Sequence, residues 1–387
     1  MCKGKKFSVV VMLIVLTASV LAFAAGSKEA AASEIVIGSV QDITGPTSSL
    51  GKMVDSGARL AIDEVNAKGG VNGKTIRIIT YDTKGDVNEA INAFTRAVTT
   101  DKVSALIGPP VANIALALAP ISERYSVPFL NLAIDPKVQI KADGTPYKNM
   151  FGMQPSADQQ GSIMAQYAIE KRGFGKFGII YNESNAYAVS LLAPFVDTVK
   201  ANGKTVAVTT SYTANDKDFK TLLNNILQAG VDAIYSPGYT QELILITQQA
   251  RAMGFKGALI YGLDAGPPFN NLLGESADNI YFINNIDTTE PHLEAITKSV
   301  KATQNIDVTN KFFLGYDIGN ILVQALGAVG SDSVAIRDYV ENLKGYQGLT
   351  GVITMDAKTH FPLGLEMVMH TYEGTTPVVL ERYSASY

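Results

Sequence analysis

The sequence predicts an α/β protein made of two doubly wound lobes, each built on a parallel sheet. Short apolar runs alternate with longer amphipathic stretches, which is the pattern of parallel strands joined by right-handed helical crossovers. The alternation begins at Ile35 and begins again after residue 150. The chain has 387 residues, a length that suits two lobes of about 150–200 residues each.

The first series of alternation predicts four strands and three helices. Gly69-Gly70 ends the first helix, Asp86 offers an N-cap to the second, and Pro120 predicts a kink or a restart in the third. The strands are expected at 35–40, 75–81, 103–107 and from 128 onward, and the helices at 54–65, 87–99 and 114–125.

The second series has the same rhythm, and the last hundred residues add helices and terminal strands. Two successive series imply two sheets of similar construction. Strands are expected at 177–181, 205–210, 233–236, 258–261, 352–355, 365–371 and 378–383. Helices are expected at 161–172, 189–201, 219–229, 242–253, 293–303, 312–328 and 334–343.

The N-terminus has the features of an export signal. Three lysines at positions 3, 5 and 6 precede an apolar stretch from Phe7 to Phe23, and Ala22-Phe23-Ala24 places small residues where a signal peptidase cleaves. An uncleaved membrane anchor is the alternative, but the stretch is short for a span of about 20 residues. We therefore expect residues 1–24 to be a signal peptide, residues 25–33 a tether, and the mature protein to be periplasmic.

Cysteine usage excludes thiol chemistry in the mature chain. The one cysteine is Cys2, within the predicted signal. The segment Phe23-Ala24-Ala25-Gly26 resembles a lipoprotein cleavage box with glycine in place of the cysteine that carries the lipid. We expect no disulfide, no thiolate metal site and no lipidation.

Composition and motifs argue against nucleic-acid binding and catalysis. The net charge is −4 without a basic block, so no nucleic-acid partner is expected. Gly173–Gly178 fits G-x-G-x-x-G, but it runs from a helix into a strand, the reverse of the dinucleotide-binding order. The three histidines lack a second ligand at metal spacing. We expect no enzyme activity, no cofactor and no metal.

Ligands of open parallel sheets bind beyond the carboxyl ends of the strands. Asp264 lies in such a loop between two glycines, where its carboxylate can pair with a ligand cation in a closing cleft or serve as a turn residue. Tyr239 lies in the preceding equivalent loop and offers an aromatic wall and a hydroxyl, or packs within the lobe. The candidate loops are 41–50, 108–113, 131–135, 182–187, 237–241 and 262–266.

From Ile35 to Asp356 the chain resembles the type I periplasmic solute-binding proteins of the leucine/isoleucine/valine-binding family. The order and spacing of several short segments carry this resemblance. They are Ile37-Gly38, Thr44-Gly45-Pro46, residues 57–66 (GARLAIDEVN) before Gly69-Gly70, residues 106–108 (LIG), 158–161 (DQQG), Asp218-Phe219, Gln249-Ala250-Arg251, Gly315-Tyr316-Asp317 and 348–351 (GLTG) leading to Met355-Asp356.

The resemblance implies a three-segment hinge with crossings near residues 155, 287 and 350. Lobe 1 would then comprise 34–155 and 288–350, and lobe 2 would comprise 156–287 and 351–387. Family members clasp an amino acid zwitterion between the lobes. Asp264 matches the acid that pairs with the ligand ammonium, Tyr239 an aromatic residue beside it, Tyr187 a tyrosine of the second lobe, and Leu50 a position that is often aromatic.

The chain departs from the family where Ser and Thr side chains hold the ligand carboxylate. Ala112 and Asn113, and then Ala133 and Ile134, stand at those positions. The amide of Asn113 and backbone N–H groups of the helix near Ile114 remain as donors to an anion. The ligand is therefore expected to be a hydrophobic amino acid held by backbone donors, or an amine, amide or other small polar compound.

These expectations converge on a non-catalytic, exported solute-binding protein of an ABC importer. It would act as a Venus flytrap, close over its ligand by hinge motion, and deliver the ligand to the permease subunits as a monomer. A sensory module that binds an amine or amide metabolite, and an exported enzyme on the same scaffold, are the alternatives.

Overall fold

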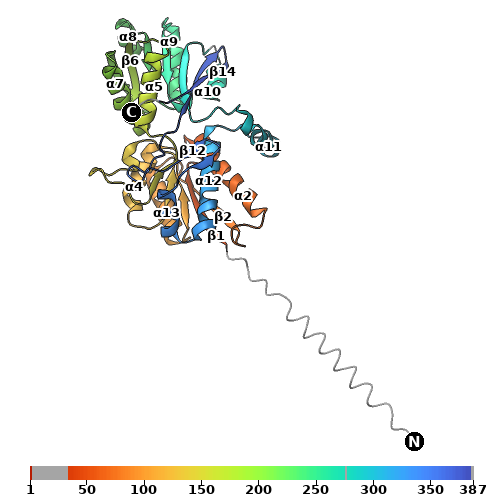
Figure 1. Cartoon of the computed structure of the whole chain (residues 1–387). Helices are drawn as coiled ribbons and strands as arrows, with labels where there is room; N and C mark the ends of the chain where they lie inside the picture. The colour runs from red at the N-terminus through yellow and green to blue at the C-terminus, as the bar shows by residue number, and fades with distance from the viewer. Residues whose placement is uncertain (2–33, 275–276, 385–387) are drawn as a thin grey trace.

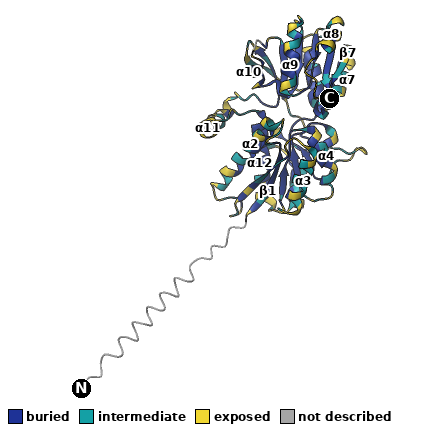
Figure 2. Cartoon of the chain, turned by 180° about the vertical axis from the view of Figure 1, so that it is seen from behind, coloured by how far each residue is buried: buried dark blue, intermediate teal, exposed yellow. Residues whose placement is uncertain are grey.

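The computed structural model describes residue 1, residues 34–274 and residues 277–384. The predicted signal peptide and tether at 2–33 and Cys2 lie outside these residues. Two α/β lobes lie one above the other and are joined by several passages of the chain (Figure 1). The strands of both lobes are buried, and exposed residues gather on the outer faces of the helices (Figure 2).

The first lobe contains a five-stranded parallel sheet of order β2-β1-β3-β4-β5. Its strands are β1 (Ile35–Gln41), β2 (Ile76–Asp82), β3 (Ala105–Ile107), β4 (Phe129–Asn131) and β5 (Met150–Gly152). One face is covered by α2 (Ser48–Asn66), α12 (Asn310–Val329) and α13 (Ser333–Glu341), and the other by α3 (Val87–Thr99) and α4 (Ala112–Ser122). Helices on both faces make this lobe doubly wound.

The second lobe contains a seven-stranded sheet of order β14-β13-β10-β9-β8-β6-β7. Its strands are β6 (Lys176–Asn182), β7 (Thr205–Tyr212), β8 (Ala233–Tyr235), β9 (Ala258–Tyr261), β10 (Ile280–Asn284), β13 (Met367–Glu373) and β14 (Thr376–Tyr383). Its helices are α5 (Ala157–Glu170), α6 (Ala186–Ser190), α7 (Leu192–Ala201), α8 (Lys220–Gln228), α9 (Thr240–Ala252) and α10 (Phe269–Leu273), and α11 (Glu294–Gln304) follows the crossing to the first lobe.

The two terminal strands depart from the all-parallel sheet that we expected in the second lobe. β13 pairs antiparallel with β10, and β14 pairs antiparallel with β13. Only Gly374 and Thr375 separate β13 from β14, and so short a link can join antiparallel strands only. The strands β5 and β10 were not predicted, because a short apolar run does not distinguish a strand from a buried helix segment by its periodicity.

Helices α2 and α12 contact each other through glycine. A Cβ atom at Gly57 would lie 1.9 Å from the carbonyl oxygen of Phe312, and one at Gly315 would lie 2.2 Å from that of Val54. Only residues without a side chain permit this backbone approach. The contact fixes the N-terminal turns of α12 against the first lobe, and α12 begins at the cleft between the lobes.

The third crossing lies later in the chain than the predicted position near residue 350. Ile353 and Met355 belong to the core of the first lobe, and the Nδ1–H group of His360 donates a hydrogen bond at 2.9 Å to the carbonyl of Met150 in β5. These contacts assign residues 351–361 to the first lobe, and the second lobe resumes with β13. The boundary between the lobes that the family resemblance placed at residue 350 was therefore wrong, because residues 351–361 still belong to the first lobe.

The polar anchor of this region is Asp317 in α12. Its buried carboxylate accepts hydrogen bonds from the backbone N–H groups of Leu349 and Thr350 at 2.8 and 2.9 Å and from the Thr350 hydroxyl at 2.7 Å. These bonds explain structurally why Gly315-Tyr316-Asp317 and the segment 348–351 occur together. Within the described residues, α12 is also the helix long and apolar enough to cross a membrane, but it is mostly buried against α2.

Candidate functional site

A cavity of about 260 Å³ lies between the lobes at the ends of the strands. The first lobe lines it with the loop before α2, with Leu50 in the first turn of α2, and with Thr309 and Asn310 around the start of α12. The second lobe lines it with Tyr239 and Asp264. The volume is slightly below the range typical of drug-sized ligands, about 300–1,000 Å³, so it suits a small molecule.

Tyr187 stacks on Tyr239 to form one wall of the site. Their ring centroids are 5.4 Å apart and their planes differ by 9°. A Cβ atom at Gly262 would lie 2.3 Å from the Tyr187 hydroxyl, so glycine there makes room for this tyrosine. The hydroxyl groups of both tyrosines are buried without a hydrogen-bond partner in the described structure. Buried polar groups are normally paired, so the hydroxyl of Tyr239, which lines the cavity, is a candidate partner for a ligand.

Asp264 follows β9 in a short 3-10 turn, Leu263–Ala265, and is 8% exposed. Its backbone carbonyl accepts a hydrogen bond from the Thr240 hydroxyl at 2.8 Å, which fixes the turn against the start of α9. Its carboxylate has no hydrogen bond from any described residue. Burial raises the pKa of the Asp264 carboxyl, and the nearby charge of Lys311 acts in the opposite direction.

Lys311 directly follows the cavity-lining residues Thr309 and Asn310 and is a buried basic residue that the sequence analysis missed. It is the second residue of α12, it is 4% exposed, and its ammonium group interacts electrostatically with Asp264. Burial lowers its pKa, and Asp264 opposes that shift. A signal was present: Lys311 is the single basic residue in the otherwise largely apolar helix 310–329. The rule that ligands bind beyond the carboxyl ends of the strands (the strand-end rule) could not find Lys311. This residue lies at the start of α12 and not in a loop that follows a strand.

Asn113 joins the two lobes directly. Its amide nitrogen donates to the carbonyl of Ser184 at 3.1 Å, and its amide oxygen accepts from the N–H of Ala186 at 2.9 Å. Both partners precede or begin α6 in the second lobe. The side chain that we expected to face a ligand anion therefore uses both its polar atoms to hold the lobes together.

The remaining predicted residues lie in the packed interior beside the cleft. Ala112, Ala133 and Ile134 are each at most 2% exposed and belong to one hydrophobic cluster. The N–H group of Ala133 is bonded to the side chain of Asn131 at 3.0 Å. The structure thus places Tyr239, Asp264 and Leu50 on the cavity and Tyr187 against Tyr239. It does not place Tyr187, Ala112, Ala133 or Ile134 on the lining.

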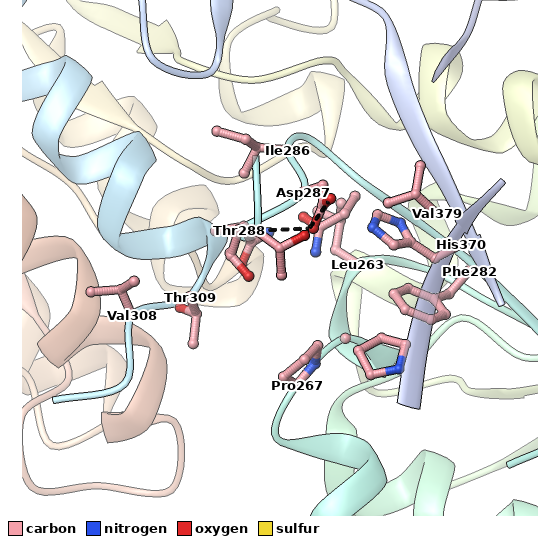
Figure 3. Close-up of a pocket in the computed structure, with 15 residues that line it drawn as sticks. Leu263, Pro267, Phe282, Ile286, Asp287, Thr288, Val308, Thr309, His370 and Val379 are labelled. Atoms are coloured by element: carbon pink, nitrogen blue, oxygen red, sulfur yellow. Dashed lines mark hydrogen bonds between the residues drawn. The ribbon is translucent and has the colours of Figure 1, made fainter. Parts of the chain in front are cut away.

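A second cavity, of about 310 Å³, adjoins the first. Figure 3 shows the residues that line this second cavity. Both cavities are lined by Leu263, Gly266, Pro267, Thr309 and Asn310. His370 stacks on Phe282 on one side of it, with centroids 4.9 Å apart, and Asp287 accepts two hydrogen bonds from Thr289 on another. The shared lining makes it an extension of the same cleft.

The described residues contain no group of three or more His, Cys, Asp or Glu side chains that could hold a metal ion. The cleft has instead the composition of a site for a small organic molecule, with aromatic rings, aliphatic side chains and one charge from each lobe. Ligand sites of this kind combine a mostly apolar lining with a few polar groups that fix orientation.

A family model described as periplasmic binding protein matches residues 34–371. The chain belongs to the periplasmic binding protein family. This confirms the resemblance and the two-lobed α/β fold that the sequence predicted. The chain is 26% identical over 342 residues to the Leu/Ile/Val-binding protein BraC3 of Rhizobium johnstonii, an alignment that covers 88% of this chain and 92% of that protein.

Solved structures of other periplasmic binding proteins have the same fold. The leucine-binding protein of Thermotoga maritima is 25% identical, with a TM-score of 0.81 over 90% of this chain and 99% of that one. The branched-chain amino acid binding protein of Streptococcus pneumoniae, solved with isoleucine, is 26% identical, with a TM-score of 0.80 over 91% and 100%. A solute-binding protein of Rhodopseudomonas palustris, solved with benzoate, shares the fold alone at 18% identity and a TM-score of 0.80.

Proposed function

We propose that this protein is an extracytoplasmic solute-binding protein that captures a small hydrophobic amino acid, such as a branched-chain one, for an ABC importer. The observation that carries the proposal is the joint position of Asp264, Tyr239 and Leu50 on one cavity between the lobes. A carboxylate beside an aromatic pair suits an ammonium group, and the aliphatic lining suits a hydrocarbon side chain. Relatives named for leucine, isoleucine and valine support the ligand class.

The cleft binds by closing over the ligand. Asp264 and Tyr239 belong to one lobe and Leu50 to the other, so the full set of contacts exists only when the lobes meet. A ligand that makes contacts in the closed form alone shifts the equilibrium toward that form. Closure also removes water from the Asp264 carboxylate, which strengthens its attraction to an ammonium group. The closed surface is then what the permease subunits recognise.

A thermal-shift measurement with each of the common amino acids tests the proposal. A ligand that binds the folded state at a concentration of about 100 Kd stabilises it by about 2.7 kcal/mol. We expect leucine, isoleucine or valine to raise the unfolding temperature, and the Asp264→Ala variant to lose that increase. If no amino acid shifts the wild-type protein, the proposed ligand class is wrong. Turnover of a bound amino acid by the purified protein would contradict the transport role.

A further inference from the structure

Lys311 is a buried basic residue at the start of α12 to which the proposed function assigns no role. Its side chain is 4% exposed, although lysine is among the residues that are least often buried. Its ammonium group forms no hydrogen bond or ion pair with any residue that the structure describes. Burying an ammonium ion costs several kcal/mol unless a partner compensates it. The protein therefore buries an amine without a partner among the described residues, in the residue that follows Asn310, which lines the cavity.

The nearest opposite charge lies across the cleft. Asp264 belongs to the second lobe and Lys311, through α12, to the first. The two groups interact electrostatically, yet no direct ion pair joins them. Two buried groups of opposite charge that interact without forming an ion pair suit a molecule that is itself positive at one end and negative at the other.

The start of α12 adds to the positive side of this place. The helix has 20 residues, and its N-cap residue Thr309 makes no side-chain capping bond. The first N–H groups of a helix have no partner within the helix, and the helix dipole favours an anion there. Thr309 and Asn310 line the cavity that Asp264 also lines. Two independent features, a buried lysine and an uncapped helix start, thus point to an anion at the same position.

We infer that Lys311, with the first N–H groups of α12, binds the carboxylate of the ligand, while Asp264 binds its ammonium group. The inference rests on the proposed function and narrows it to a zwitterion held by one charge from each lobe. It also accounts for Ala112 and Ala133, where hydroxyl donors to the carboxylate are absent. Lys311, which follows the second crossing between the lobes, donates to the ligand carboxylate in place of the hydroxyl groups that are absent at those two positions.

The test compares three probes of the same hydrocarbon skeleton by calorimetry at neutral pH. L-Leucine carries both charges, 3-methylbutylamine lacks the carboxylate, and 4-methylpentanoate lacks the ammonium group. Each is titrated into the wild-type protein, into Lys311→Met, and into Lys68→Met as a control, because Lys68 is an exposed lysine at the other end of α2. Thermal unfolding of each variant verifies that it is folded.

We expect Lys311→Met to weaken leucine at least about tenfold, which corresponds to about 1.4 kcal/mol, and to leave 3-methylbutylamine within about threefold. Lys68→Met should change neither. An equal effect of Lys311→Met on leucine and on the amine, or no effect on leucine, overturns the inference while the amino acid carrier stands. If none of the three probes binds the wild-type protein, the proposed branched-chain ligand fails, and the inference fails with it.

A second measurement needs no variant that could misfold. The charge of 4-methylpentanoate is constant from neutral to alkaline pH, whereas Lys311 loses its proton at a pH below the usual lysine range, since burial lowers its pKa. The affinity of the wild-type protein for 4-methylpentanoate should therefore fall as the pH rises from about 7 to 10. A constant affinity over that range contradicts a contact between the carboxylate and Lys311.

Discussion

The two walls of the cleft are built on different principles. The wall of the second lobe comes from loops that directly follow sheet strands, where Asp264 follows β9 and Tyr239 follows β8. The wall of the first lobe owes its charge to Lys311 at the start of a helix that enters this lobe after the second crossing. The strand-end loops of the first lobe provide an interlobe contact through Asn113 and packed interior through Ala133 and Ile134.

The contrast between the walls shows that the strand-end rule predicts where a site lies but not which residues carry its charge. The rule applies to both lobes, because both sheets are parallel around the cleft. In the second lobe the loop residues carry the charge. In the first lobe none of the described side chains that line the cavity is charged, and the buried Lys311 belongs to a distant segment of the chain. Substitutions in each wall, and a change of pH, test this difference between the lobes.

The largest effect is expected at the charged residue of the second wall. Asp264→Ala should weaken L-leucine by about 2–5 kcal/mol, the scale for truncating one partner of a buried charge pair. Calorimetry measures the loss. Asp63→Ala is the matched control, since Asp63 is an exposed residue of α2 that lines neither cavity, and it should change affinity less than about threefold. Unchanged affinity in Asp264→Ala would remove that residue from the site.

The next effect concerns the support of the first wall. Gly315→Ala would place a Cβ atom 2.2 Å from the carbonyl oxygen of Val54 and should lower the free energy of unfolding by about 1–3 kcal/mol through overpacking. It should also weaken leucine, because Lys311 lies one helical turn away. Gly327→Ala is the control in the same helix, with no atom within 4 Å of its Cβ, and should be neutral or stabilise by up to about 1 kcal/mol. Denaturant titrations of both variants that coincide would contradict the close helix contact.

A smaller effect is expected from pH. Burial raises the pKa of Asp264, so the carboxyl is protonated at a higher pH than in a free side chain. As the pH is lowered, leucine affinity should therefore begin to fall above the usual aspartate range of about 4. The fall is at most about tenfold per pH unit. The folded empty protein binds this proton more tightly than the unfolded chain, so the same group stabilises the empty protein as the pH falls. Asp264→Asn should lack both dependences when compared with wild type by calorimetry and thermal unfolding.

The smallest effect is expected at the contact between the lobes. Asn113→Ala removes two hydrogen bonds that exist only when the lobes meet, each worth about 0.5–1.5 kcal/mol. Leucine should dissociate about threefold to tenfold faster, with little change in association. Stopped-flow fluorescence or surface plasmon resonance measures both rates. Asn88→Ala, an exposed residue of α3 in the same lobe, should leave both rates unchanged, and a slower association in Asn113→Ala would argue for a role in the open form instead.

Much of the architecture was predictable because it depends on local patterns. Periodicity and glycine or proline breaks predicted most strands and helices, and Asp86 is the N-cap of α3 as expected. The loops that hold Asp264, Tyr239 and Leu50 followed from the strand-end rule together with the family resemblance. The structure places these residues on one cavity, and their part in binding stays a prediction.

The features that escaped prediction depend on contacts between distant segments. Lys311 is buried because α12 packs on α2, and nothing in its neighbouring residues reveals that burial. The later third crossing arises because Ile353 and Met355 enter the core of the first lobe. Asn113 has an ordinary place at a helix start, and only the approach of residues 184–186 determines what its amide binds. Long-range pairing of this kind is invisible to a periodicity analysis of one sequence.

The glycine contact between α2 and α12 gives the two lobes unequal roles in selecting a guest. Leu50 near the start of α2 and Asn310 at the start of α12 both border the cavity, and backbones in direct contact have no slack to shift independently. The first lobe is therefore the rigid side of the cleft, and it limits the size and shape of the ligands that fit. Variants that widen or narrow the range of bound compounds should be sought among the loops of the second lobe, where a side chain can change without displacing α2 and α12.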